Sequence, residues 1–284
     1  MMADKSTAEM FAPMYGSIVL EMVSDSPAGE LLGETTKEYT FECCGEKMDM
    51  AELQEIWEAK LEPVYPYRKA GPTVEKINGK LNAPAAPKIG VAKPKVIIPV
   101  FPGTNCEYDT AKAFARAGAD PEILVIRNLT PADVTASCEA LVKAIGQSQI
   151  VMLPGGFSGG DEPDGSAKFI ASFFRNPAVT EAVRELLQKR DGLMLGICNG
   201  FQALIKLGLV PYGDIRPITA YDPTLTFNTI GRHQSMLVRT RVASTGSPWL
   251  SHCDAGSEYE IAISHGEGRF VAPQNVLDQL VANG

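Results

Sequence analysis

From residue 93 onward, the chain alternates between short apolar runs and longer amphipathic stretches. Short continuous apolar runs predict buried strands, and apolar positions spaced three and four residues apart predict helices. Strands are predicted at 95–101, 122–127, 149–153 and 193–197. Helices are predicted at 107–118, 130–145, 177–190, 201–207 and 273–282. This alternation indicates an α/β fold with a doubly wound, mostly parallel sheet covered on both faces.

Sheets of this kind place their functional sites at the carboxyl ends of the strands. The loops predicted to carry function are therefore 102–106, 154–161 and 198–200, each of which follows a predicted strand.

The first 75 residues have a different pattern, which predicts a small α+β part. The apolar run 16–23 predicts a strand, 38–42 predicts another, and 50–61 has apolar positions at helical spacing with Asp49 as its cap and Leu53 facing inward. This part is too small to hold a good core alone, so it is the end of something larger or a lid on the second part. No periodicity survives over the stretch 66–94, which is rich in Pro, Gly, Ala and Lys. The expected organisation is 1–75, a linker at 76–92, and a domain at 93–284.

Composition narrows the class of protein. With 45% hydrophobic and 21% charged residues among 284, the chain is an ordinary globular protein. No apolar run reaches the ~18 residues that span a bilayer, and the N-terminus has no signal-peptide pattern. A net charge of −8 without a basic block disfavours nucleic acid or an anionic membrane as a partner.

The six cysteines show no CxxC pair or zinc spacing, so no metal site is predicted. Scattered cysteines of this kind indicate reduced thiols and a cytoplasmic protein. Adjacent residues Cys43 and Cys44 are not expected to bridge each other.

The chemistry concentrates at Cys198. The segment Gly196-Ile197-Cys198-Asn199-Gly200 lies between a predicted strand and a predicted helix, which is the nucleophile-elbow pattern with cysteine in place of serine. Glycines two residues to either side let the backbone turn tightly. The helix N-terminus stabilises a thiolate, and the N–H of Asn199 is positioned to bind an oxyanion.

Two other elements support a nucleophile. The run 153–161 (LPGGFSGGD) follows a predicted strand and offers backbone N–H groups, and it is not a phosphate loop because no Gly-Lys-Ser/Thr follows. A thiolate also needs a base, and the chain has three histidines. On spacing alone, His265 with Glu267 after a predicted strand is the best candidate for base and orienter.

These motifs carry a resemblance. In sequence order they are PGTNC at 102–106, LPGGFSGGD at 153–161, GICNGFQ at 196–202 and SHGEGRF at 264–270. Together they resemble the glutaminase domains of the phosphoribosylformylglycinamidine synthase family, which are class I glutamine amidotransferases of purine biosynthesis. The resemblance covers about residues 93–284. Residues 1–75, with FAPMYGSIVLEM and LEPVYP, are similar to the end of the ATP-dependent synthetase half of the large single-chain form.

The resemblance implies a mechanism in which Cys198 attacks the side-chain amide of glutamine and forms a glutamyl thioester. Ammonia then passes to the synthetase half, which holds ATP and magnesium, so this chain itself needs no cofactor. By the same resemblance, the oxyanion and glutamine-binding residues are Gly155, Gly156, Phe157, Asn199, Gln202, Asn228 and His233. Asn105 is expected at the adjacent strand end.

One departure from the family pattern changes the expectation for the base. In the family, the catalytic His and Glu belong to a later His-Pro-Glu-Arg segment, which does not occur in this sequence. His265 and Glu267 match the pocket-side HGEG motif instead, so the resemblance lowers them as the catalytic pair. The chain is therefore expected to be truncated and, by itself, inactive in glutamine hydrolysis.

Two alternatives stay open. In the first, the chain is a non-catalytic module that offers docking or ammonia-channel surface to a synthetase. In the second, it is an unrelated cysteine hydrolase with a nucleophile elbow.

Overall fold

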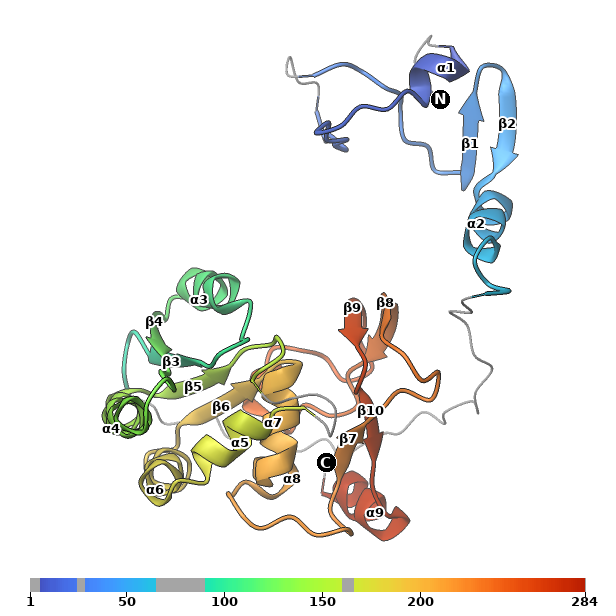
Figure 1. The fold of residues 1–284 in the computed structure, drawn as a ribbon. Coiled ribbons are helices and arrows are strands. Elements are labelled where there is room, and N and C mark those ends of the chain that lie inside the picture. Colours follow the sequence, from blue (N-terminus) through green and yellow to red (C-terminus); the bar gives the residue numbers. More distant parts are fainter. Residues whose placement is uncertain (1–5, 25–28, 65–89, 160–165, 284) are drawn as a thin grey trace. The chain divides into compact units, whose positions relative to one another are not determined.

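The computed structural model describes residues 6–24, 29–64, 90–159 and 166–283, and its chain divides into two compact units, 1–72 and 73–284 (Figure 1). The boundary expected near residue 75 lies outside the described residues. So do most of the linker expected at 76–92 and two residues of the expected functional loop 154–161, Gly160 and Asp161.

The second unit is built on a four-stranded parallel sheet in the order β4-β3-β5-β6 (Figure 1). Its strands are β3 (Lys95–Val100), β4 (Asp120–Val125), β5 (Ile150–Leu153) and β6 (Leu193–Gly196). All four strands predicted from the apolar runs are confirmed, with ends that differ by at most two residues.

Successive residues of each strand face opposite sides of the sheet, and the central strands β3 and β5 are buried on both sides. Ile97 belongs to a core cluster with residues of the helices α4, α5, α6 and α7, whereas its neighbours Val96 and Ile98 belong to a second cluster with residues of α3. The sheet is therefore covered on both faces, and the predicted doubly wound α/β fold is confirmed.

Helices connect the strands as the sequence predicts. Their bounds are α3 (Glu107–Arg116), α4 (Pro131–Gln147), α5 (Lys168–Phe174), α6 (Pro177–Arg184), α7 (Asn199–Leu207), α8 (Leu209–Tyr212) and α9 (Gln274–Ala282). Thr130 caps α4 in a reciprocal capping box with Asp133. The single helix predicted at 177–190 ends as a π-helical segment, Glu185–Lys189. Helices α5 and α8 were not predicted.

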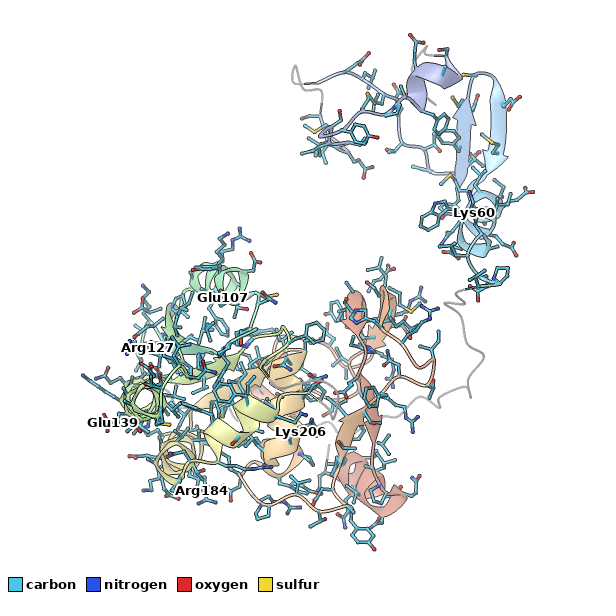
Figure 2. The ribbon with its side chains drawn as sticks, viewed as in Figure 1. Lys60, Glu107, Arg127, Glu139, Arg184 and Lys206 are labelled. Atoms are coloured by element: carbon cyan, nitrogen blue, oxygen red, sulfur yellow. The ribbon has the colours of Figure 1, made fainter. Side chains whose placement is uncertain are left out.

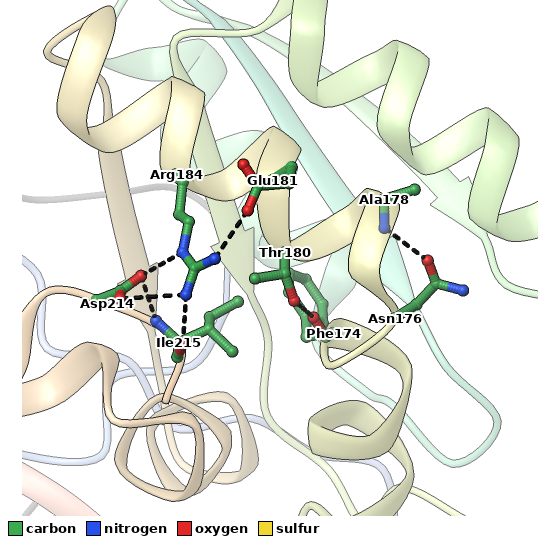
Figure 3. A network of polar contacts seen from close by, with 8 residues as sticks. All are labelled: Phe174, Asn176, Ala178, Thr180, Glu181, Arg184, Asp214 and Ile215. Carbon is green, nitrogen blue, oxygen red and sulfur yellow. Dashed lines mark hydrogen bonds and ion pairs between the residues drawn. The ribbon is translucent and has the colours of Figure 1, made fainter. Parts of the chain in front are cut away.

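An arginine ties α6 to the chain that follows α8 (Figure 3). Arg184 donates from Nε to Asp214 Oδ1 at 2.8 Å and from Nη2 to Oδ2 at 3.2 Å, and also to the Ile215 carbonyl at 3.0 Å. Its Nη1 donates to Glu181 at 2.7 Å. The hydrogen bond from Arg184 is the main cause that lowers the pKa of Asp214. Figure 2 shows Arg184 and exposed Glu139 as labelled side chains on α6 and α4.

Beyond the sheet, two antiparallel pairs carry the last predicted motif. Strand β8 (Gln234–Arg241) pairs with β9 (Glu258–His265), and β7 (Thr224–Thr226) pairs with β10 (Arg269–Val271). A short 3-10 helix, Pro248–Leu250, lies between β8 and β9. The HGEG segment begins at His265, the last residue of β9, so it lies at the end of a strand as the sequence predicts.

The first unit has helix α1 (Thr7–Met10), the antiparallel strands β1 (Thr40–Cys43) and β2 (Glu46–Asp49), and helix α2 (Met50–Ala59). Asp49 caps α2 by accepting hydrogen bonds from the N–H groups of residues 51 and 52, which confirms that prediction. Among the described residues of this unit, Cys43 is the one buried hydrophobic residue. The unit is therefore as poor in core as its length predicts.

The strand predicted at 16–23 is wrong. Residues 17–22 are irregular, and the apolar side chains of Ile18, Val19 and Leu20 are exposed. An apolar run becomes a strand only when a neighbour satisfies its backbone groups. No strand pairs with it among the described residues of this unit.

All six cysteines are free thiols, as predicted, and the adjacent sulfurs of Cys43 and Cys44 lie 3.5 Å apart. Across the described parts of the chain, no helix is both long and apolar enough to span a membrane.

Asp222 accepts a dense set of hydrogen bonds after α8. The Tyr212 hydroxyl donates to Oδ1 at 2.7 Å, Arg216 Nη2 donates to the same oxygen at 2.5 Å, and Thr219 donates from its N–H and hydroxyl to Oδ2 at 2.7 and 2.8 Å. The Arg216 guanidinium also stacks on the Tyr212 ring at 3.4 Å. These donors, the tyrosine hydroxyl first, hold the pKa of Asp222 far below its ordinary value.

Removing the Asp222 carboxylate should therefore lower the free energy of unfolding more at neutral pH than in acid. A carboxylate whose pKa is lowered by folding contributes stability above its unfolded pKa of ~3.9, and that contribution disappears as the pH falls through the lower folded value. We expect Asp222→Asn to lower the urea midpoint near neutral pH, and the gap to the unchanged chain to narrow below about pH 4. Urea unfolding across this pH range measures the gap. A difference in urea midpoint that does not change with pH would contradict the conclusion that the Asp222 carboxylate stabilises the fold.

Phe101 anchors the end of β3 to α5. Its ring makes edge contacts with Phe169 and Phe173 at centroid distances of 5.7 and 5.4 Å, and it lies 6.3 Å from Phe174. We expect Phe101→Ala to lower the free energy of unfolding by about 3–5 kcal/mol, because it leaves a cavity in the core. The control Leu129→Ala, at a side chain that is 90% exposed, should change it by less than ~0.5 kcal/mol. Equal effects in urea unfolding would mean that this cluster does not stabilise the sheet.

Candidate active site

Cys198 occupies a sharp turn between β6 and α7. Its backbone has φ 53° and ψ −110°, a conformation that residues other than glycine rarely adopt. Its side chain is exposed, and Asn199 opens the helix. A strained, exposed nucleophile at a strand-to-helix turn is the geometry of the elbow predicted from the sequence. The first turn of α7 also presents the positive end of a helix dipole to the sulfur.

The two glycines of the elbow are required by close backbone contacts. A methyl group on Gly200 would lie 2.0 Å from the carbonyl oxygen of Leu153 at the end of β5. A methyl group on Gly196 would lie 2.6 Å from the carbonyl carbon of Gly200. The N–H of Gly200 donates to the Pro154 carbonyl at 3.1 Å. The glycines therefore let α7 approach β5 closely. The sequence predicts only that they allow a tight turn.

The three loops expected to carry function meet at this point. Asn105 donates its N–H to the Gly155 carbonyl at 2.9 Å, and Phe157 donates to the Gly103 carbonyl at 3.0 Å. A methyl group on Gly155 would lie 3.2 Å from Cβ of Cys198. The predicted neighbours of Cys198 are therefore in contact, and Asn105 lies at the adjacent strand end as expected.

A cavity of about 260 Å³ opens beside Cys198. Its lining comes from the glycine-rich loop, the start of α7, the segment before β8 and the HGEG segment. The lining residues are Gly156, Phe157, Ser166, Cys198, Gln202, Phe227, Gly231, Arg232, His233, Ser264, His265, Gly266 and Glu267. A larger hollow of about 480 Å³, near Arg175 and Arg216, contains none of the predicted site residues. The smaller cavity is therefore the candidate site.

Asn228 does not line the cavity, but it holds the HGEG segment that does. Its Nδ2 donates to the carbonyls of His265 at 2.7 Å and Arg232 at 3.1 Å, so its Oδ1 can only accept. That oxygen lies 3.0 Å from Nδ1 of His265 and 3.3 Å from the N–H of Gly268. The proton of neutral His265 is thereby assigned to Nδ1, and its Nε2 keeps the lone pair.

Spacing alone suggested that Glu267 orients the ring of His265. In the structure, the two side chains have different partners. The Glu267 carboxylate is buried and accepts from the hydroxyl of Ser166, while its backbone carbonyl accepts from Gln202 Nε2 at 2.9 Å. The partner of the His265 ring is Asn228 instead. Long-range contacts decide which side chain meets the imidazole, and a His-x-Glu spacing does not reveal them.

The remaining predicted residues differ in whether they line the cavity. Asn199 is buried at the start of α7, where its Nδ2 donates to Gln202 Oε1 at 3.2 Å. His233 lines the cavity, and its Nε2 lies 2.8 Å from the Ser264 hydroxyl. His252 lies in an exposed turn and does not line the cavity.

Six lining residues were not among the predicted site residues. They are Ser166, Phe227, Gly231, Arg232, Ser264 and Gly266. Arg232 stands directly before the predicted residue His233, so its charge was a usable signal. Ser166 lies in no motif, and only the fold brings it to Glu267.

The elbow makes a direct prediction. We expect Gly200→Ala to destabilise the fold by at least ~2 kcal/mol and to slow alkylation of Cys198, because the added methyl group meets a backbone carbonyl. The matched control is Gly146→Ala in α4, where nothing lies within 4 Å of the added carbon, so stability should stay or rise. Urea unfolding and the rate of iodoacetamide reaction measure the two effects. Unchanged values for Gly200→Ala would refute the close approach of α7 to β5.

Comparison with known proteins agrees with this geometry. A sequence model described as a CobB/CobQ-like glutamine amidotransferase domain matches residues 93–284. The chain is 36% identical to phosphoribosylformylglycinamidine synthase subunit PurQ of Symbiobacterium thermophilum over 187 residues, which are 65% of this chain and 66% of that protein. It is 37% identical to the subunit of the same name in Mycolicibacterium paratuberculosis, over 67% of this chain and 71% of that protein.

Among solved structures, PurLQS from Thermotoga maritima is similar with a TM-score of 0.47 and 25% identity, over 64% of this chain and 70% of that one. The chain thus spans about two thirds of the length of these curated relatives. With a family match that includes the elbow, the cavity and the HGEG segment, the chain belongs to the CobB/CobQ-like glutamine amidotransferase family.

Proposed function

We propose that this chain provides the glutaminase function of a phosphoribosylformylglycinamidine synthase. The observation that carries the proposal is a cysteine on a nucleophile elbow that opens into a small cavity, whose lining includes polar and charged residues. Membership of the amidotransferase family and the names of the PurQ relatives support glutamine as the substrate.

In the proposed reaction, the Cys198 thiolate attacks the carboxamide carbon of glutamine. Backbone N–H groups of Gly156 and Asn199 would stabilise the oxyanion, since the glycine-rich loop touches the elbow and Asn199 opens α7. The leaving nitrogen takes a proton from water as this intermediate collapses, which releases ammonia and leaves a glutamyl thioester. Water then hydrolyses the thioester to glutamate and frees the thiol.

The ammonia would serve an ATP-dependent synthetase, which would amidate formylglycinamide ribonucleotide. The relatives are named as subunits of that enzyme, which supports a synthetase partner. ATP and magnesium would act in the synthetase part. We further propose that residues 1–75 are the end of that part in the large single-chain form. The sparse core of the first unit and its exposed Trp57, 80% accessible, favour this arrangement.

Covalent labelling tests the glutaminase assignment. A diazoketone analogue of glutamine should modify Cys198, and excess glutamine should suppress the modification, because both ligands need the same cavity. Peptide mapping by mass spectrometry locates the adduct. Labelling needs only the nucleophile and the cavity, so the test does not depend on complete turnover.

Cys106 is the internal control, because it is also exposed but does not line the cavity. Selective, glutamine-suppressed labelling that is lost in Cys198→Ala is the expected result. Equal labelling of Cys106 and Cys198, or labelling that glutamine does not suppress, would refute a glutamine site.

A further inference from the structure

The larger hollow of the second unit is lined by the end of α5, the first turn of α6 and the segment after α8. Its volume of about 480 Å³ falls within the ~300–1,000 Å³ of pockets that hold small molecules. The lining residues are Arg175, Thr180, Ile215, Arg216, Pro217 and Ile218. Two of these described residues are arginines and none is acidic. In a chain with a net charge of −8, such a lining favours an anionic ligand.

Arg175 keeps most of its hydrogen-bond donors for a ligand. It is the exposed residue that ends α5, and its Nη2 donates to the Lys206 carbonyl at 2.8 Å. Within the described part of the chain this is the one hydrogen bond of its side chain, which has no carboxylate partner there. A guanidinium has five N–H donors. The remaining donors of Arg175 are therefore available, while the bond to α7 restrains the side chain.

Arg216 is held in place by other side chains. Its Nη2 donates to Asp222 at 2.5 Å, and its guanidinium stacks on the Tyr212 ring at 3.4 Å. Among the residues that the structure describes, its buried Nε has no hydrogen-bond partner, and Nη1 makes no hydrogen bond either. The guanidinium is therefore fixed at one nitrogen and keeps donors that an anion in the hollow can use.

The carboxylates of this region already have partners. Asp214 accepts two hydrogen bonds from Arg184 on α6 (Figure 3), and Asp222 accepts from Arg216. Neither carboxylate lines the hollow. The described residues thus leave the charge of Arg175 uncompensated, and a bound anion would compensate it.

The rest of the lining is mostly apolar. Ile215, Pro217 and Ile218 stand on either side of Arg216 in the sequence, and all three line the hollow. The Thr180 hydroxyl donates to the Phe174 carbonyl at 2.9 Å, so its proton is already used (Figure 3). The guanidinium groups therefore supply the donors of this site, and the apolar side chains suit a ligand that carries an apolar body.

We propose that this hollow binds a small organic phosphate, with the phosphate between Arg175 and Arg216 and the apolar body against the isoleucine and proline side chains. Guanidinium groups match phosphate oxygens in planar, paired hydrogen bonds. Two guanidinium groups also match the nearly two negative charges of a phosphomonoester better than the single charge of a carboxylate. The hollow shares no lining residue with the cavity beside Cys198, so the inference goes beyond the proposed function and does not depend on it.

Phenyl phosphate is the probe, because it joins a phosphomonoester to an apolar ring. Titration calorimetry on the full chain at pH 8, above the second phosphate pKa of about 6, measures its affinity. Benzoate keeps the ring with a single carboxylate charge, and inorganic phosphate keeps the charge without the ring. We expect phenyl phosphate to bind one site per chain, and about tenfold more tightly than either control ligand.

Two variants test the two arginines. Arg175→Gln should weaken phenyl phosphate binding roughly 10- to 100-fold, the range of lost hydrogen bonds to a charged group. Arg216→Lys keeps a positive charge beside Asp222 but loses the planar fork, so it should weaken binding by about three- to tenfold. Arg116→Gln is the matched control, because it removes the same charge from an exposed arginine of α3 that does not line the hollow. Its affinity should stay within about twofold.

Each outcome decides. Phenyl phosphate that does not bind, or that binds as tightly to Arg175→Gln or Arg216→Lys as to the unchanged chain, overturns the site. Equal weakening by Arg116→Gln also overturns it, because binding would then follow the net charge of the chain. Inorganic phosphate or benzoate that binds as tightly as phenyl phosphate overturns the assignment to an organic phosphate. Labelling of Cys198 by the glutamine analogue tests the proposed function separately.

Discussion

The close approach of α7 to the end of β5 is the constraint on which the site depends. The carbonyl of Leu153 occupies the space that any side chain at residue 200 would need, and the Pro154 carbonyl accepts the N–H of Gly200. This contact brings the glycine-rich loop against Cys198. It also sets the direction of α7, and therefore the place where Gln202 meets the HGEG segment.

Sequence patterns predict the sheet well because its central strands, β3 and β5, are buried on both faces. An apolar run such as 95–100, when helices flank it, predicts a buried strand of a parallel sheet. Helix α5 escapes the same reasoning because KFIASFF is apolar almost all round and shows no helical period. The run at 16–23 misleads for the opposite reason, since an apolar pattern does not state which neighbour will pair with it.

The site likewise has residues that the sequence reveals and residues whose roles only the fold reveals. Cys198 and its glycines follow from a local rule of backbone geometry, so the sequence is enough to find them. The roles of Asn228 and Glu267 arise from contacts across 37 and 101 residues of chain, to His265 and Ser166 respectively. A spacing of two residues made Glu267 look like the partner of His265, whereas the fold gives that place to an amide.

The contacts of α7 form a closed ring. Gln202 near its start binds the Glu267 carbonyl, the Glu267 carboxylate binds the Ser166 hydroxyl, and the Ser166 carbonyl binds Lys206 near its end. A helix fastened to one wall at two points a full turn apart cannot roll about its axis without breaking both. The backbone of Cys198 at the start of this helix is thus held in place when the chain folds, so a substrate does not have to order the helix on binding.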